Sequence, residues 1–206
     1  MVLMHKLKAR WLQILTHVAA LLPLALLAWD YWQGQLIDLV REITTRTGKT
    51  ALILLILSLA CTSINIIFGF KQVMRVRRAL GLYAFMYAGL HFLTFVGLDY
   101  GFDFDLLGQG ILDQRYVLVG FAAGLLLLLL AITSTQGWQK RLGKNWKRLH
   151  QLVYLAGVLD VVHFTWLAKD NREPLRYGVV VALLLIMRIP GIRKAVSDAR
   201  YWLKTR

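Results

Sequence analysis

The stretch 116–135, YVLVGFAAGLLLLLLAITST, holds twenty residues without one charged side chain. An α-helix rises about 1.5 Å per residue, so a helix of this length spans roughly 30 Å, the thickness of the hydrocarbon core of a membrane. A strand of a membrane barrel would alternate apolar and polar residues, and this stretch does not. The stretch therefore predicts a helix that crosses a membrane.

Apolar runs of this kind recur along the whole chain. Six are recognised, at 11–29, 51–70, 79–98, 116–135, 149–168 and 177–189. The sixth is short, and we expect Arg188 at its end to extend toward the membrane surface. Of the 206 residues, 58% are hydrophobic and only 17% are charged, whereas soluble domains carry about 25% charged residues. The sequence predicts an all-α, polytopic membrane protein, a six-helix transmembrane bundle formed as one domain over residues 1–206.

The formal net charge of +14 is distributed unevenly between the polar segments that separate the runs. When Arg188, near the end of the sixth run, is counted with the seventh segment, the first, third, fifth and seventh segments hold 18 of the 25 Lys and Arg. The other three hold nine of the eleven acids. Because cytoplasmic segments are enriched in Lys and Arg, both termini are predicted to be cytoplasmic. Topology and contact with anionic lipid explain the basic charge, and no nucleic-acid partner is expected.

Histidines are the most informative residues for function. His5 lies in the basic N-terminal tail, and His17, His91, His150 and His163 lie within or at the edges of apolar runs. Such residues are costly in a membrane and indicate function, although they also serve as hydrogen-bonded links between helices. Thirteen helical residues separate the last two by about 20 Å, which suits two sites stacked across the membrane. Zinc needs three or four convergent ligands, whereas haem needs one or two imidazoles with apolar walls.

Cations cluster beside the third and fifth runs, on the predicted cytoplasmic side. Haem propionates or a cytoplasmic electron donor would find positive charge there, although the positive-inside rule explains the same residues equally well. They are Arg75, Arg77, Arg78, Lys144, Lys147 and Arg148.

Three motifs resemble the MsrQ (YedZ) family of the ferric reductase-like transmembrane superfamily. They are RRALGLYAFMYAGLHF at 77–92, TSTQGWQKRLGKNWKRLHQLVYL at 133–155 and VVHFTW at 161–166. With LTHVAALLPLALL in the first run and TRTGKTAL before the second, the resemblance covers nearly the whole chain.

The resemblance implies a b-type cytochrome of the bacterial inner membrane. Such a protein carries electrons from the quinone pool or a cytosolic flavin reductase to a periplasmic molybdopterin methionine sulfoxide reductase, which repairs oxidised proteins. This chain would be the electron-transfer subunit and not itself the reductase. The implied cofactors are haem b, one or two per chain, and FMN.

The resemblance also assigns individual residues. His91 and His163 would be the axial ligands of a periplasmic-side haem, and His150 a ligand or close neighbour of a cytoplasmic-side haem. The superfamily has a second histidine where this chain has Arg77, so the sixth ligand of an inner haem and the number of haems stay open. His17 is a candidate for an extra ligand or for a contact to a quinone or a propionate. Asp160 either orients the imidazole of His163 or faces the lipid headgroups.

Two other functions stay open at this point. One is a terminal reductase of ferric iron or oxygen at the periplasmic-side haem. Such proteins usually carry a fused flavin and nicotinamide domain, and the sequence has no G-x-G-x-x-G motif. The other is a transporter or scaffold whose histidines only link helices. For electron transfer to a partner, the acidic segment with Asp99, Asp103 and Asp105 is the predicted docking face.

Overall fold

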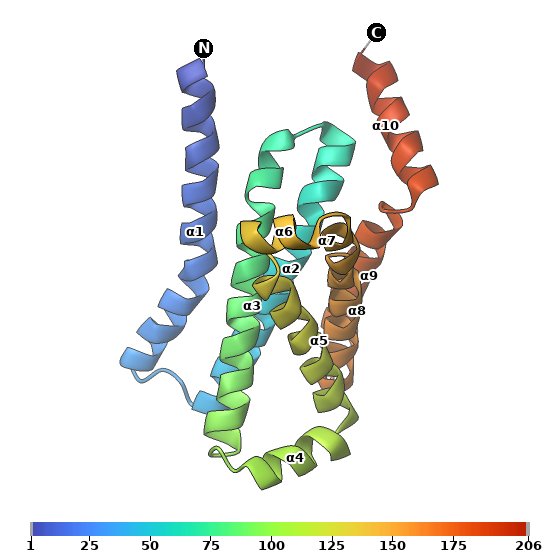
Figure 1. Cartoon of the computed structure of the whole chain (residues 1–206). Helices are drawn as coiled ribbons and strands as arrows, with labels where there is room; N and C mark the ends of the chain where they lie inside the picture. Colours follow the sequence, from blue (N-terminus) through green and yellow to red (C-terminus); the bar gives the residue numbers. More distant parts are fainter. Residues whose placement is uncertain (1, 205–206) are drawn as a thin grey trace.

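The computed structural model describes residues 2–204, and the side chains of residues 11–202; every regular element in that range is helical (Figure 1). The elements are α1 (Val2–Trp32), α2 (Leu39–Phe68), the 3₁₀ helix η1 (Lys71–Arg75), α3 (Arg77–Thr94), the π-helix η2 (Phe95–Asp99), α4 (Phe104–Asp113), α5 (Arg115–Ile132), α6 (Gln136–Leu142), α7 (Lys144–Leu149), α8 (Leu152–Leu167), α9 (Arg172–Ile186) and α10 (Pro190–Lys204). The predicted all-α class is confirmed.

Several of these helices are suited to cross a membrane. Four are long and apolar enough on their own, namely Trp11–Trp32, Leu39–Phe68, Arg77–Asp99 and Arg115–Ile132. Arg172–Ile186 and Pro190–Trp202 qualify as one further segment, bent by 78° at the break between them. α8 has 16 residues and is therefore about 24 Å long, shorter than the hydrocarbon core. The predicted count of six crossings stays a prediction.

α2 forms the centre of the bundle and carries more buried residues than any other described helix. Its apolar side chains cover more than one face, so it can pack against α3 on one side and against α8 and α9 on another. Leu55 and Leu59 are almost fully buried there, together with Ala84 of α3 and Ala156 of α8. Leucines on the outer surface, among them Leu93, Leu125 and Leu183, are exposed, as expected of helices that face lipid.

The two ends of the bundle differ in charge. The connections at one end contain η1, α6 and α7, and α10 lies beyond them; we call this the basic end (Figure 1). At the other end, α4 crosses beneath α3 and α5, joined to α3 by the π-helix; we call this the acidic end (Figure 1). Asp103 accepts hydrogen bonds from the backbone N–H groups of Asp105 and Leu106 and so caps α4.

α1 changes direction midway, at a turn that contains Pro23 (Figure 1). Proline has no N–H group and weakens the helical ladder at this turn. The hydroxyl of Tyr87, from α3, donates to the carbonyl of Ala20 at 2.8 Å and accepts from the N–H of Leu24 at 3.1 Å. Tyr87 is 1% exposed, so this one side chain fixes α1 to the bundle at its kink.

Tyr87→Phe is therefore expected to destabilise the protein by about 1–2 kcal/mol, because two backbone groups of α1 lose their buried partner. The measurement is the thermal unfolding temperature of the detergent-purified protein. Tyr83→Phe is the control, since Tyr83 bonds only the exposed His17. Equal unfolding temperatures for the two variants would show that the Tyr87 hydroxyl does not hold α1.

The basic end departs from the sequence prediction in two places. The helix of the predicted fifth run, 149–168, begins later than predicted, because α7 ends at Leu149 and α8 begins at Leu152. His150 occupies the junction between them and not the same continuous helix as His163. Arg188 does not extend to the surface as predicted: it turns into the bundle, and its Nη2 donates to the carbonyl of Leu59 at 2.6 Å. Arg188 lies at the break between α9 and α10, where the two helices are bent by 78°.

Candidate functional site

His91 of α3 and His163 of α8 face each other in the half of the bundle nearer the acidic end. Their ring centres lie 6.1 Å apart, and the two ring planes are nearly perpendicular, at 86°. Both side chains are partly buried. The sequence analysis placed them on separate helices, and the structure brings them together as a pair.

Each imidazole is oriented by a backbone carbonyl of a neighbouring helix. Nδ1 of His91 donates to the carbonyl of Thr44 in α2 at 2.9 Å, and Nδ1 of His163 donates to the carbonyl of Tyr116 in α5 at 2.7 Å. A carbonyl oxygen only accepts, so Nδ1 must carry the proton in both rings. In a neutral imidazole, Nε2 then keeps its lone pair for a metal ion.

Two glycines allow this close approach. A Cβ at Gly48 would lie 2.9 Å from Nδ1 of His91, and a Cβ at Gly120 would lie 2.6 Å from Nδ1 of His163. Real Cβ contacts are essentially never shorter than 3.0 Å, so a larger residue at either position would displace the ring or the helix. Each glycine stands four residues after the residue whose carbonyl accepts this hydrogen bond. A side chain there, one turn along the helix, would cover that carbonyl.

The two halves of the site repeat one arrangement. Thr44, Gly48 and His91 in the α2–α3 pair correspond to Tyr116, Gly120 and His163 in the α5–α8 pair, at an offset of 72 residues in every case. The sequence analysis missed both glycines and both carbonyls. The equal glycine-to-histidine spacing was the available signal, but a match of two residue types becomes visible only once the pairs are known.

The geometry of the pair suits one metal ion bound between two imidazoles. A metal-bound nitrogen lies about 2.0–2.1 Å from the metal and about 1.1 Å from its ring centre, so two such rings would have centres roughly 6–6.5 Å apart. Among the side chains described, no group of three His, Cys, Asp or Glu gathers to hold a metal. Two imidazoles are enough protein ligands for haem, because the macrocycle supplies the other ligands of the iron.

The helix that orients His91 is held on both sides. Arg46 of α2 forms ion pairs with Asp30 and with Glu42. Lys49 forms an ion pair with Glu173 of α9 at 2.8 Å and lies over the ring of Phe164, next to His163. These pairs are partly exposed, so each contributes little alone, but together they fix the turn of α2 that carries Thr44 and Gly48.

His150 lies apart from this pair, at the basic end. Its Nε2 is 3.2 Å from the hydroxyl of Thr133, and its ring stacks on Trp146 with centres 4.1 Å apart. The indole of Trp146 donates to the carbonyl of Thr133 at 2.8 Å, which closes a three-residue cluster. Within the described side chains no second imidazole contacts His150.

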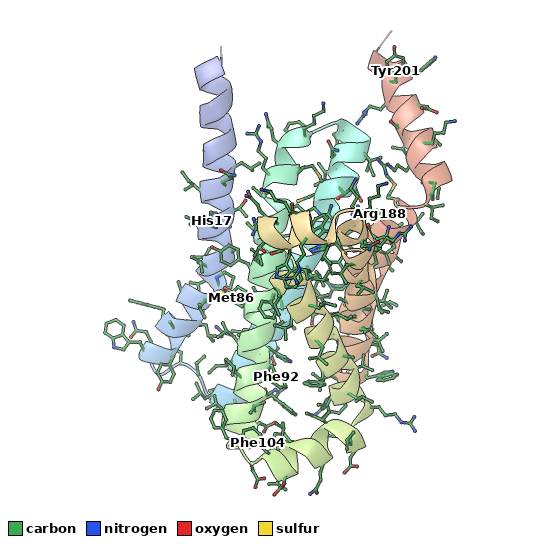
Figure 2. All side chains as sticks on the ribbon, in the orientation of Figure 1. His17, Met86, Phe92, Phe104, Arg188 and Tyr201 are labelled. Atoms are coloured by element: carbon green, nitrogen blue, oxygen red, sulfur yellow. The ribbon has the colours of Figure 1, made fainter. Side chains whose placement is uncertain are left out.

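His17 is exposed on α1, and its Nδ1 lies 2.9 Å from the hydroxyl of Tyr83. Figure 2 shows His17 nearer the basic end and Phe92, the neighbour of His91, nearer the acidic end. The structure therefore does not bring His17 to the facing pair. The side chain of His5 lies outside the part that the structure describes.

The remaining predicted site residues separate into two groups. Five of the six cations are exposed at the basic end, and only Arg77, at the start of α3, is partly buried. The exposed five are Arg75, Arg78, Lys144, Lys147 and Arg148. Asp160 lies one turn before His163, but the oxygen that orients His163 is the carbonyl of Tyr116.

Comparison with known proteins gives consistent matches. Residues 47–161 match the family described as ferric reductase like transmembrane component. A protein of Xanthomonas axonopodis pv. citri is 48% identical over 183 residues, covering 85% of this chain and 84% of its own length. A protein of Rhodospirillum rubrum is 41% identical over 189 residues, covering 90% and 91%. Both are named protein-methionine-sulfoxide reductase heme-binding subunit MsrQ. No solved structure gives a significant match.

Proposed function

The chain belongs to the ferric reductase-like transmembrane family and, within it, to the MsrQ subunits; on this premise we propose that it is a b-type cytochrome that carries electrons through a membrane to a methionine sulfoxide reductase. Its relatives are named as the haem-binding subunit of that reductase. The observation that carries the proposal is the facing pair of His91 and His163, with ring centres 6.1 Å apart.

His91 and His163 are the residues that would hold the haem iron, through Nε2. When bound, haem supplies a reversible one-electron couple. The carbonyls of Thr44 and Tyr116 fix the tautomer of each imidazole and increase its basicity, which favours the oxidised iron and lowers the potential. Phe92 of α3 and Phe121 of α5, each next in the sequence to a residue of the site, pack with ring centres 5.8 Å apart and link the two helices.

We place this site in the outer half of a bacterial inner membrane. The basic end would face the cytoplasm together with both termini, and α8 and α9 would complete six crossings. α8 is shorter than the hydrocarbon core, and the polar residues that follow it reach the headgroups at the acidic end. A reporter fused after residue 206 tests this topology, since a green fluorescent protein folds only on the cytoplasmic side.

The exposed cations of the basic end suit a soluble electron donor better than a buried propionate. Lys144, Lys147 and Arg148 of α7 are solvent-facing, as a docking surface for a cytosolic flavin reductase requires. A membrane quinone is the alternative donor, and His17 on the lipid-facing side of α1 is its proposed contact. FMN is proposed from the family resemblance alone, and flavin analysis of the purified protein tests it.

A single experiment tests the proposed function. The detergent-purified protein is reduced with a limiting amount of dithionite, and its reduced-minus-oxidised spectrum is followed. We expect a b-type spectrum that is reoxidised by the molybdopterin partner only when methionine sulfoxide is also present. A colourless protein would contradict the proposal. Reoxidation by ferric citrate, at the same rate without the partner, would instead support the terminal-reductase alternative.

The acidic end is the proposed docking face for that partner. Asp99, Asp103 and Asp105 are exposed there, beside and within α4. Neutralising all three to Asn is expected to slow electron delivery roughly tenfold at low ionic strength and little at high salt, because steering depends on unscreened charge. Asn at 103 still caps α4, so the fold is kept.

The control for this triple variant is Asp38→Asn with Asp170→Asn. Both residues also accept backbone hydrogen bonds at helix starts and lie in the other acidic-end connections. Stopped-flow reoxidation by the partner at two salt concentrations gives the rates. Unchanged rates in the triple variant would remove this surface from the docking face.

A further inference from the structure

Arg188, in the basic half of the bundle, uses only part of its hydrogen-bonding capacity. It lies in the bend between α9 and α10, where Figure 2 labels it. Nη2 donates to the carbonyl of Leu59, and the guanidinium lies over the ring of Tyr154, 5.5 Å from its centre. Nε is buried and has no hydrogen-bond partner. A buried guanidinium N–H without an acceptor is costly, so the site calls for an acceptor.

Two hydroxyls on α2, about one turn beyond Leu59, are also unpaired. Thr62 and Ser63 follow Leu59 by three and four residues, so their side chains lie over the turn whose carbonyl Arg188 contacts. The Oγ1 of Thr62 and the Oγ of Ser63 are buried and without a partner, and Ser63 is 3% exposed. By contrast, Thr47 and Thr94, in comparable helical positions, donate to the carbonyl four residues earlier.

The charge at this place is positive and is not compensated within the described side chains. Arg77 of α3 and Arg193 of α10 are close enough to repel Arg188. No carboxylate acts on Arg188, and the ion pairs of the described residues involve Arg46 and Lys49 at the acidic end. The unpaired Nε–H of Arg188 and the two unpaired hydroxyls are the kind of donors that bind an oxyanion.

We propose that Arg188, Thr62 and Ser63 form an oxyanion site that binds the phosphate of an anionic phospholipid at the basic end. The haem at His91 and His163 cannot supply the anion, because Gly48, beside His91, is about 22 Å along α2 from Ser63. A basic site between membrane helices at the headgroup level is a place where anionic lipids bind. α10 presents further cations, Arg193 and Lys194, on its exposed surface to the same leaflet. The site is therefore separate from the haem site of His91 and His163.

The test uses full-length protein in a zwitterionic detergent, with phosphatidylglycerol or phosphatidylcholine added. We expect phosphatidylglycerol to raise the unfolding temperature and one molecule of it to stay bound in native mass spectra. Arg188→Gln keeps a donor for Leu59 but removes the charge, and is expected to weaken phosphatidylglycerol binding about tenfold. Arg176→Gln, at the other end of α9, is the matched control and should bind as wild type does.

A second variant tests the site without touching any cation. Thr62→Val with Ser63→Ala removes two hydroxyls that have no protein partner, so the lipid-free unfolding temperature should not fall, whereas phosphatidylglycerol binding should weaken a few-fold. Wild-type binding in both Arg188→Gln and this variant would overturn the proposal, as would equal loss in Arg176→Gln. Should inorganic phosphate alone raise the unfolding temperature as much as phosphatidylglycerol does, with Arg188→Gln abolishing that rise, the result would support an oxyanion site and overturn a phospholipid as its ligand.

Discussion

His91→Ala and His163→Ala will each remove the haem spectrum of the purified protein. The two imidazoles face each other with ring centres 6.1 Å apart, so one iron would take both as ligands. Residues that only orient a metal ligand change metal affinity about 10–100-fold, so loss of a ligand itself should cost at least about 100-fold. The haem content by pyridine haemochrome and the visible spectrum measure this directly.

Two further histidine variants make this result interpretable. His17→Ala should keep the full haem content, because His17 is exposed and bonds Tyr83. His150→Ala counts the haems: unchanged content means one haem, and loss of a separate fraction means a second haem at the basic end. Haem that survives in both His91→Ala and His163→Ala would show that the facing pair is not the ligand set.

The apolar runs predicted the helical elements because membrane helices are recognisable from length and composition alone. They did not predict where helices break. His150 was placed on one helix with His163, yet the chain turns between Leu149 and Leu152, and the ring stacks on Trp146. Such local breaks depend on side-chain contacts between segments distant in the sequence, and hydropathy does not encode these contacts.

Arg188 shows the same limit for a single side chain. An arginine at the end of a short apolar run is expected to reach for the headgroups. Here the residue lies at the 78° bend before α10, and its Nη2 donates to the carbonyl of Leu59. Hydropathy does not reveal this contact. The resemblance gave His91 and His163 as candidate ligands, and the structure brings the two rings close together. The groups that orient them are backbone carbonyls, which carry no residue-type signal.

Gly120→Ala is expected to reduce haem affinity about 10–100-fold, the range found when the partner that orients a metal-binding histidine is lost. The new Cβ would stand 2.6 Å from Nδ1 of His163, so the ring must move and give up its bond to the carbonyl of Tyr116. Gly48→Ala should have the same effect on His91 to a smaller degree, because its Cβ would stand 2.9 Å away. Titration of the haem-free protein with haem gives the haem affinity of each variant. The midpoint potential of the bound haem is measured on the same samples.

Gly124→Ala is the control for the effect of replacing glycine by alanine in this helix. Gly124 lies one turn beyond Gly120 on the same helix, and a Cβ there would meet nothing within 4 Å. Alanine in a helix is favoured over glycine by about 0.5–1 kcal/mol, so Gly124→Ala should leave haem binding intact and hold or raise the unfolding temperature. Because the same substitution has the same intrinsic benefit at 120, a loss of haem there can only come from the displaced imidazole. Equal haem affinity in Gly120→Ala and Gly124→Ala would therefore show that the space left by Gly120 does not position His163.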